Sequence, residues 1–233
     1  MSIVPIAKVV ISPEQIFYDL IYNHLFYLDE PDQEEGIFFS FISGNYIIKN
    51  NIMILESWDW DFWGSNGQIY PNSKIRKFIN NPNNNQYIEK ILKDVAQSIT
   101  ENNFLGYPVK NNQVFSFLVD FQNQRNTHYW HQDADRSVFI GLVYLPKKII
   151  STKVQVPAQQ ITLIIPEQGY PGLKPWDNHR LMITPKMQDC LGKLEIFQKN
   201  FYSNEIVFIN NLANYHATPT KTNSYLVRFK ITS

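Results

Sequence analysis

The second half of the chain consists of short apolar segments separated by turn residues, with no helical periodicity between them. Residues 113–121 alternate between apolar and polar side chains, and residues 138–145 form an almost continuous apolar run. Clusters of Pro and Gly, such as residues 169–172, mark the turns. Many short strands without intervening helices favour antiparallel sheets packed as a sandwich or jelly roll. The strands expected in this half are residues 113–121, 138–145, 160–165, 193–198, 205–210 and 225–231.

The first half of the chain is expected to hold two amphipathic helices. Residues 12–25 begin with a Ser-Pro helix start and continue with apolar residues at helical spacing. A second helix is expected over about residues 84–101, with one apolar stripe facing the core. Strands are expected over residues 36–43 and 46–56, and the Asn-rich residues 80–85 are expected to form a loop. The predicted fold class is therefore mainly β with flanking helices.

Residues 57–64 contain three tryptophans, Trp58, Trp60 and Trp63. One interpretation is a hydrophobic corner packed beneath a loop. The other is an aromatic wall for a substrate pocket, since aromatic side chains line most small-molecule sites.

The length of the chain suits one domain with a substantial core. We expect residues 1–233 to form a single unit. Residues 1–110 would supply supporting helices and strands, and residues 111–233 would form the jelly-roll core, with an insertion around residues 166–192.

Composition narrows the classes of partner. Lys plus Arg and Asp plus Glu both number 21, so no global field attracts polyanions, and a small-molecule substrate is favoured over nucleic acid. Cys190 is the only cysteine, which excludes a disulfide within these residues and a multi-cysteine metal site. No signal peptide is recognisable and no stretch approaches 18 uninterrupted apolar residues. The expectation is a cytoplasmic protein without a membrane span, whose oligomeric state the sequence does not determine.

A candidate metal motif lies between two of the expected strands. His131 and Asp133 are two residues apart, and in extended backbone such residues point to the same face. One imidazole and one carboxylate can therefore bind a single ion. A pair of this kind arises easily by chance, so a third ligand from elsewhere in the chain is needed.

The third ligand is expected near the C-terminus. His216 follows the strand expected at residues 205–210, and Arg228 lies twelve residues later on the last strand. If these two strands pair antiparallel, His216 and Arg228 come to one end of the same cavity. Two histidines and one carboxylate leave three metal positions open, which suits non-haem Fe(II) and its oxygen chemistry.

These motifs resemble a known family. In His131-x-Asp133, in His216 followed by Ala-Thr-Pro, and in Arg228 on the closing strand, the sequence resembles the Fe(II)/2-oxoglutarate-dependent dioxygenases, which have a double-stranded β-helix core. The resemblance spans about residues 113–231. The phytanoyl-CoA hydroxylase-like branch and the amino-acid hydroxylases are the members that the chain resembles most.

The resemblance implies a role for each motif residue. His131, Asp133 and His216 would be the iron ligands, and Arg228 would bind the distal carboxylate of 2-oxoglutarate as a planar bidentate fork. Many members place Ser two residues after this Arg, whereas this chain has Lys230. The long gap between Asp133 and His216 implies a sizeable insertion between the two halves of the barrel.

The resemblance also implies an activity, which is hydroxylation coupled to the conversion of 2-oxoglutarate and O₂ to succinate and CO₂. Asp133 favours hydroxylation over halogenation, because related halogenases have Ala or Gly in its place. The preferred substrate class is an amino acid or a similar polar metabolite. The candidate substrate contacts flank the metal motif or lie on a loop of the insertion, and they are His128, Trp130, Asp135, Arg136 and Trp176. Each of them also has a structural interpretation, as a residue that forms a turn, anchors a loop or orients a metal ligand.

Two other functional classes stay open. A cupin-like metal-dependent isomerase would use the His/Asp/His site without oxoglutarate, and binding of oxoglutarate through Arg228 distinguishes it from an oxygenase. A non-enzymatic jelly-roll domain would use Trp58, Trp60 and Trp63 as a ligand platform.

Overall fold

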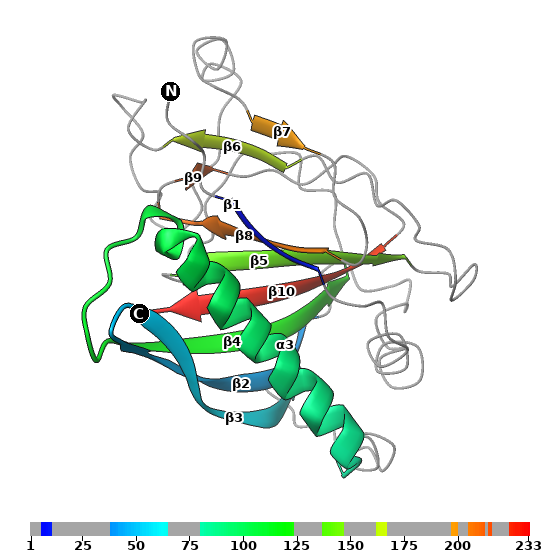
Figure 1. Ribbon diagram of the computed structural model, residues 1–233. Coiled ribbons are helices and arrows are strands. Elements are labelled where there is room, and N and C mark those ends of the chain that lie inside the picture. The colour runs from blue at the N-terminus through cyan, green and yellow to red at the C-terminus, as the bar shows by residue number, and fades with distance from the viewer. Residues whose placement is uncertain are drawn as a thin grey trace.

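The computed structural model describes residues 6–10, 38–64, 80–123, 137–146, 162–166, 197–199, 205–212, 214–215 and 224–233. Within these residues, a seven-stranded antiparallel sheet carries one long helix on one of its faces (Figure 1). Strand β1 is one edge of the large sheet, and a separate three-stranded sheet lies beyond this edge. The fold is mainly β with a flanking helix, as the sequence predicts.

Both sheets pair their strands antiparallel throughout. The order in the large sheet is β1 (Ile6–Val10), β8 (Glu205–Asn210), β5 (Ser137–Pro146), β10 (Ser224–Thr232), β4 (Val114–Asn123), β2 (Phe38–Lys49) and β3 (Ile52–Gly64). The order in the small sheet is β7 (Phe197–Lys199), β6 (Thr162–Pro166) and β9 (Asn214–Tyr215).

The chain passes back and forth between the two sheets in its second half. It leaves the large sheet after β5 for β6 and β7, returns for β8, leaves for β9 and returns for β10. This exchange of strands between two sheets is the jelly-roll arrangement that the run of short strands predicts. Its central strands in the large sheet are β4, β10, β5 and β8.

Helix α3 (Pro82–Glu101) covers one face of the large sheet. Asn81 is its N-cap and accepts a hydrogen bond from the Asn83 backbone nitrogen at 3.1 Å, and Pro82 occupies the first turn. The loop predicted over residues 80–85 is therefore wrong from Pro82 onward, because capping residues resemble loop residues in composition. The predicted apolar stripe is confirmed, since all five of its residues are buried against the sheet: Ile88, Ile91, Leu92, Val95 and Ile99.

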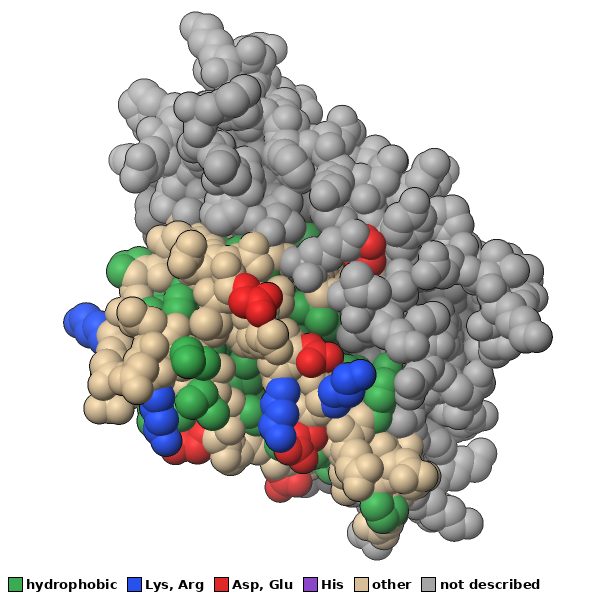
Figure 2. Space-filling view, viewed as in Figure 1, with side chains coloured by type: hydrophobic (Ala, Val, Ile, Leu, Met, Phe, Trp, Pro, Cys, Tyr) green, Lys and Arg blue, Asp and Glu red, His purple; other side chains and the backbone are tan. Residues whose placement is uncertain are grey.

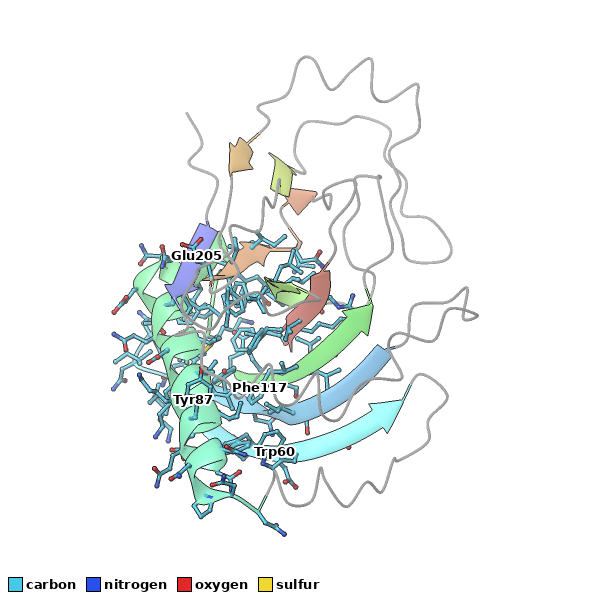
Figure 3. The ribbon with its side chains drawn as sticks, turned by 90° about the vertical axis from the view of Figure 1, so that its right-hand side faces the viewer. Trp60, Tyr87, Phe117 and Glu205 are labelled. Atoms are coloured by element: carbon cyan, nitrogen blue, oxygen red, sulfur yellow. The ribbon has the colours of Figure 1, made fainter. Side chains whose placement is uncertain are left out.

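The main core fills the space between α3 and the sheet (Figure 3). It consists mainly of aliphatic side chains and also contains several aromatic rings, of which those of Phe208 and Phe229 meet edge to face with centroids 5.9 Å apart. The Tyr46 hydroxyl is buried and donates a hydrogen bond to the Leu92 carbonyl oxygen at 3.0 Å. Burial raises the pKa of Tyr46, so the phenol stays a neutral donor.

The β2–β3 hairpin differs most from the sequence prediction. The expected break at residues 44–45 is absent, and the turn lies at Asn50 and Asn51, whose φ angles are 52° and 60°. Adjacent left-handed residues give the hairpin turn that matches strand twist, and Asn tolerates that conformation. At Gly44 the strands approach so closely that a Cβ atom would lie 2.3 Å from the Ser57 carbonyl oxygen. Glycine is required there inside a continuous strand.

Other boundaries agree with the sequence to different degrees. Five predicted strands are confirmed within two residues at each end, namely those observed as β4, β5, β6, β8 and β10. The strand predicted over residues 193–198 corresponds to β7, which begins at Phe197, and residues 193–196 lie outside the described residues. Strands β1 and β9 and the short 3-10 helix η2 (Asn103–Gly106) were not predicted. The helix predicted over residues 12–25 also lies outside the described residues. No helix in the described part of the chain is long and apolar enough to cross a membrane.

Candidate functional site

A row of side chains crosses the four central strands on the face turned away from α3. Arg228 on β10 is the register partner of Asp120 on β4 and of Leu142 on β5, and Leu142 is in turn the partner of Val207 on β8. Directly opposed residues of an antiparallel sheet project from the same face. Phe229, the next residue along β10, packs in the core that α3 covers, so this row lies on the opposite face.

Asp120 and Arg228 form an ion pair within this row. The Arg228 Nε atom donates to Asp120 Oδ1 at 3.0 Å, and Nη2 donates to Oδ2 at 3.3 Å. The Asp120 side chain is 0% exposed and the Arg228 side chain is 14% exposed. Two parallel hydrogen bonds between planar groups fix the guanidinium in orientation as well as in position. One edge of the guanidinium is therefore held against β4.

Lys230 lies two residues after Arg228 and projects from the same face of β10. Its register partners are Leu118 on β4 and Ile140 on β5, and its side chain is half-buried. Arg228 and Lys230 therefore form two successive cationic positions on one strand. Asp120 is the register partner of the first of them.

The charged side chains on this face are set among buried apolar residues. Ile140, Leu142, Val207 and Ile209 are all buried, although they lie outside the core cluster that α3 covers. Charges interact more strongly in such surroundings than in water, because fewer water molecules screen them. The face combines buried apolar side chains with a few oriented polar groups, a composition that small-molecule sites share.

The predicted iron ligands belong to parts of the chain that the structure does not describe. His131, Asp133 and His216 lie outside the described residues, as do all the other histidines of the chain. Along the chain, Asp133 comes four residues before β5 begins at Ser137, and His216 directly follows β9. No cluster of three His, Cys, Asp or Glu side chains occurs among the residues that the structure describes. The predicted substrate contacts also lie outside them: His128, Trp130, Asp135, Arg136 and Trp176.

The predicted pairing of the strand before His216 with the last strand is wrong. Strand β5 lies between β8 and β10, and the short strand β9, in the other sheet, intervenes in the chain between β8 and His216. The described residues of β5 from Ser137 to Val143 are all buried. A strand that is apolar on both faces is most stable at the centre of a sheet, which accounts for its insertion there.

The tryptophan-rich residues 57–64 lie in strand β3 and not at a corner beneath a loop. The register of β2 and β3 shifts between Asn45 and Tyr46, and such a bulge reverses which residues face the core. Trp58 and Trp60 consequently pack against the core beneath α3, with ring centroids 5.7 Å apart. Trp60 Nε1 also donates to Asn85 Oδ1 on α3 at 2.9 Å. These two tryptophans attach β3 to the helix.

Asp120 is not among the site residues that the sequence predicts. Its signal was present, because a carboxylate follows the apolar residues 117–119 at a position of the same parity as Leu118. A charged residue in the middle of a central strand requires a partner. The identity of that partner, 108 residues away, depends on the strand register.

Charges on the α3 side of the molecule are mixed. Figure 2 shows basic and acidic side chains close together on this side, and Lys93 and Glu89 form an exposed ion pair on the helix. The described part of this side carries no broad patch of one sign.

Comparisons with known proteins give distant likenesses. No family model matches the chain, and no curated protein matches it. Among solved structures, the chain is similar to the Fe(II)/α-ketoglutarate-dependent dioxygenase TqaL, with 8% sequence identity and a TM-score of 0.43. The superposition covers 97% of this chain and 82% of the TqaL chain. A bsmA homologue from Methylobium petroleophilum PM1 has 10% identity, a TM-score of 0.40 and coverages of 97% and 88%. IDO from Bacillus thuringiensis has 15% identity, a TM-score of 0.35 and coverages of 97% and 92%. The assignment of the fold rests on the order of the strands in the two sheets.

Proposed function

We propose that this chain is a non-haem Fe(II)- and 2-oxoglutarate-dependent oxygenase that hydroxylates a small polar metabolite such as an amino acid. The observation that carries the proposal is Arg228, a guanidinium held rigidly at 14% exposure on the face of the jelly roll away from α3. Its position on the last strand is the one that the resemblance in sequence assigns to the oxoglutarate-binding arginine. The positions of the metal motif next to β5 and of His216 after β9 agree with the same assignment.

The donor set around Arg228 fits a dicarboxylic oxo acid. A guanidinium has five N–H donors, and the bonds to Asp120 use its Nε and Nη2 side. A planar guanidinium held in a fixed orientation is the type of group that binds a carboxylate through two parallel hydrogen bonds, as the distal carboxylate of the oxo acid would require. Leu142 and Val207, in the same row, are buried and apolar, so they help to exclude water from the surroundings of the guanidinium.

His131, Asp133 and His216 would hold the iron, because two imidazoles and one carboxylate suit Fe(II) and leave positions for other ligands. When bound, iron and oxoglutarate together supply the activation of O₂ for substrate oxidation. Arg228 would orient the oxo acid by its far end, and Asp120 would keep the guanidinium from turning. The retained carboxylate of Asp133 favours hydroxylation as the outcome.

Anaerobic titration with Fe(II) and 2-oxoglutarate tests this function. The wild-type protein should give the weak visible charge-transfer band of a chelated complex. His131→Ala, Asp133→Ala and His216→Ala should each lose Fe(II) binding by calorimetry, whereas the matched control His24→Ala should retain it. Arg228→Lys keeps a charge for Asp120 but loses the planar fork, and it should weaken oxoglutarate binding at least tenfold.

The turnover assay completes the test. Aerobic incubation of the wild-type protein with Fe(II), ascorbate and a metabolite panel should release succinate. If no band forms and no metabolite gives succinate above the uncoupled background, the oxygenase proposal is wrong.

One observation favours a second candidate, a cupin-like metal-dependent isomerase. Asp120 balances the charge of Arg228, and the same ion pair would suit a protein in which Arg228 does not bind the carboxylate of a ligand. Such an enzyme would bind Fe(II) through the same triad but show no affinity for 2-oxoglutarate. The titration above distinguishes the two candidates.

A further inference from the structure

The segments that carry the predicted iron ligands join the large sheet at neighbouring strand ends. Strand β5 begins at Ser137, four residues after Asp133, and β8 ends at Asn210, six residues before His216. The two strands pair antiparallel, and Phe139 is the register partner of Asn210, so the start of β5 lies beside the end of β8. Four to six extended residues span at most about 14–22 Å. The relative position of these two strand ends therefore limits where the ligands can meet.

Asn211, the first residue after β8, fastens the two strand ends together. Its backbone nitrogen donates to the Val138 carbonyl oxygen at 2.8 Å, and its side-chain Nδ2 atom donates to the Ser137 carbonyl oxygen at 2.9 Å. Asn211 is 1% exposed, and Ser137 is fully buried. A buried amide is costly without hydrogen-bond partners, and here one residue bonds two successive carbonyl groups of β5. These two bonds fix both the distance and the orientation between the strand ends.

The preceding residue holds the same strand end from another side. The Asn210 Oδ1 atom accepts from the Leu212 backbone nitrogen at 3.0 Å, which shapes the turn that leaves β8. Its Nδ2 atom donates at 3.2 Å to the carbonyl oxygen of Leu105 in η2. Phe104 and Leu105 have φ angles of 51° and 52°, a left-handed conformation that is uncommon for residues other than glycine. Two consecutive buried asparagines thus tie the end of β8 to β5 and to the turn that follows α3.

We propose that Asn211 is a positioning residue of the metal centre. It aligns the segment before β5 with the segment after β8, so that His131, Asp133 and His216 converge on one ion. In this role it acts through the ligands and not by contact with the ion. The inference rests on the proposed function, since it concerns the metal of that same site. Loss of the Nδ2 donor would keep every ligand but leave the two segments less well aligned, and metal affinity depends on such alignment.

The decisive variant is Asn211→Asp, which keeps the size of the side chain and replaces the donating amide group with an oxygen atom. Co(II) is the metal probe under anaerobic conditions, because its visible bands report the number and geometry of its ligands. We expect the variant to bind Co(II) at least tenfold more weakly than wild type and to show bands of different position or intensity. The matched control Tyr46→Phe removes another buried donor to a carbonyl oxygen, on a strand that three others separate from β8. It should leave the Co(II) affinity within twofold and the bands unchanged.

Hydrogen exchange in the wild-type protein gives a second test that needs no variant. The Asn211 amide donates to Val138, so its exchange requires the two strand ends to separate. Because coupling between two events is reciprocal, a metal that needs aligned strand ends also keeps them together. Saturating Co(II) should slow exchange at Asn211 at least tenfold. Exchange at Met53, whose amide donates to Thr100 on α3, should slow less than threefold.

The outcomes separate this inference from the function on which it rests. If wild-type protein binds Co(II) and Asn211→Asp binds it equally well, or if Tyr46→Phe weakens it as much, the role of Asn211 is wrong and the oxygenase proposal stands. If Asn211→Asp does not fold, the exchange rate at Asn211 decides, and a rate that Co(II) leaves unchanged refutes the inference. If Asn211 behaves as expected but wild-type protein shows no band with Fe(II) and 2-oxoglutarate, the oxygenase proposal fails and the role of Asn211 stands. Wild-type protein that binds no Co(II) contradicts both.

Discussion

The Asp120–Arg228 pair makes a quantitative prediction about stability. The change is a double-mutant cycle with Asp120→Leu, Arg228→Met and the two combined. Each single substitution leaves one charge buried without its partner, whereas the double substitution replaces both charges with apolar groups of similar volume. We expect each single variant to be much less stable than the double variant.

The magnitude follows from the geometry of the pair. At 3.0 Å between Nε and Oδ1, the Coulomb attraction is about 5.5 kcal/mol for an effective dielectric constant of about 20. Desolvation offsets much of this when both partners are present, but removing one partner from a buried pair costs about 3–5 kcal/mol. The double variant should lie within about 2 kcal/mol of wild type, so the two single variants together should cost at least about 4 kcal/mol more than the double variant, and this difference is the coupling energy.

Urea denaturation followed by tryptophan fluorescence measures the free energy of unfolding of all four proteins. The exposed pair Lys93–Glu89 on α3 serves as the control, and its cycle should give a coupling energy below about 0.5 kcal/mol. Single variants of Asp120 and Arg228 that each cost under about 1 kcal/mol and add up to the double variant would refute the buried pair. The orientation assigned to Arg228 would then have no support.

Three further changes test other parts of the fold. Gly44→Ala should destabilise the protein by at least about 1–3 kcal/mol in urea, because the new methyl group meets the Ser57 carbonyl oxygen; an unchanged midpoint would contradict the close approach of the strands. Tyr46→Phe should cost about 1 kcal/mol, since it leaves a carbonyl oxygen of α3 without its buried donor, and a neutral result would argue against that hydrogen bond. Burial and the nearby Asp59 carboxylate raise the pKa of Asp61 above its usual value of 3.8. Between pH 3.8 and the raised pKa, the folded state therefore binds more protons than the unfolded state, and the free energy of unfolding falls as the pH rises through this range. Asp61→Asn should therefore raise the melting temperature at pH 7, and this gain should vanish below pH 3.8, where both states are protonated.

The sequence by itself determined most of the local structure. Strand β8 matches its predicted range, and the apolar run in β5 indicated a buried strand, because side-chain polarity records which faces of a segment meet water. For the same reason, the apolar stripe in the sequence of α3 predicted which face of the helix is buried. The motif residues His131, Asp133 and His216 suggested the chemistry, and this remains a prediction.

The tertiary structure decided the features that depend on neighbours. The bulge that turns Trp58 and Trp60 toward α3 exists only in the register between β2 and β3, and no local propensity specifies it. Strands β8 and β10 are close in sequence but do not pair, because β5 lies between them. Strand β5 is apolar on both faces, and such a strand is most stable with a neighbour on each side. Arg228 was recognisable from the sequence, but its pairing with Asp120 was not. Their pairing required two strands 108 residues apart to align in one register, and such alignment is set by the packing of the whole sheet.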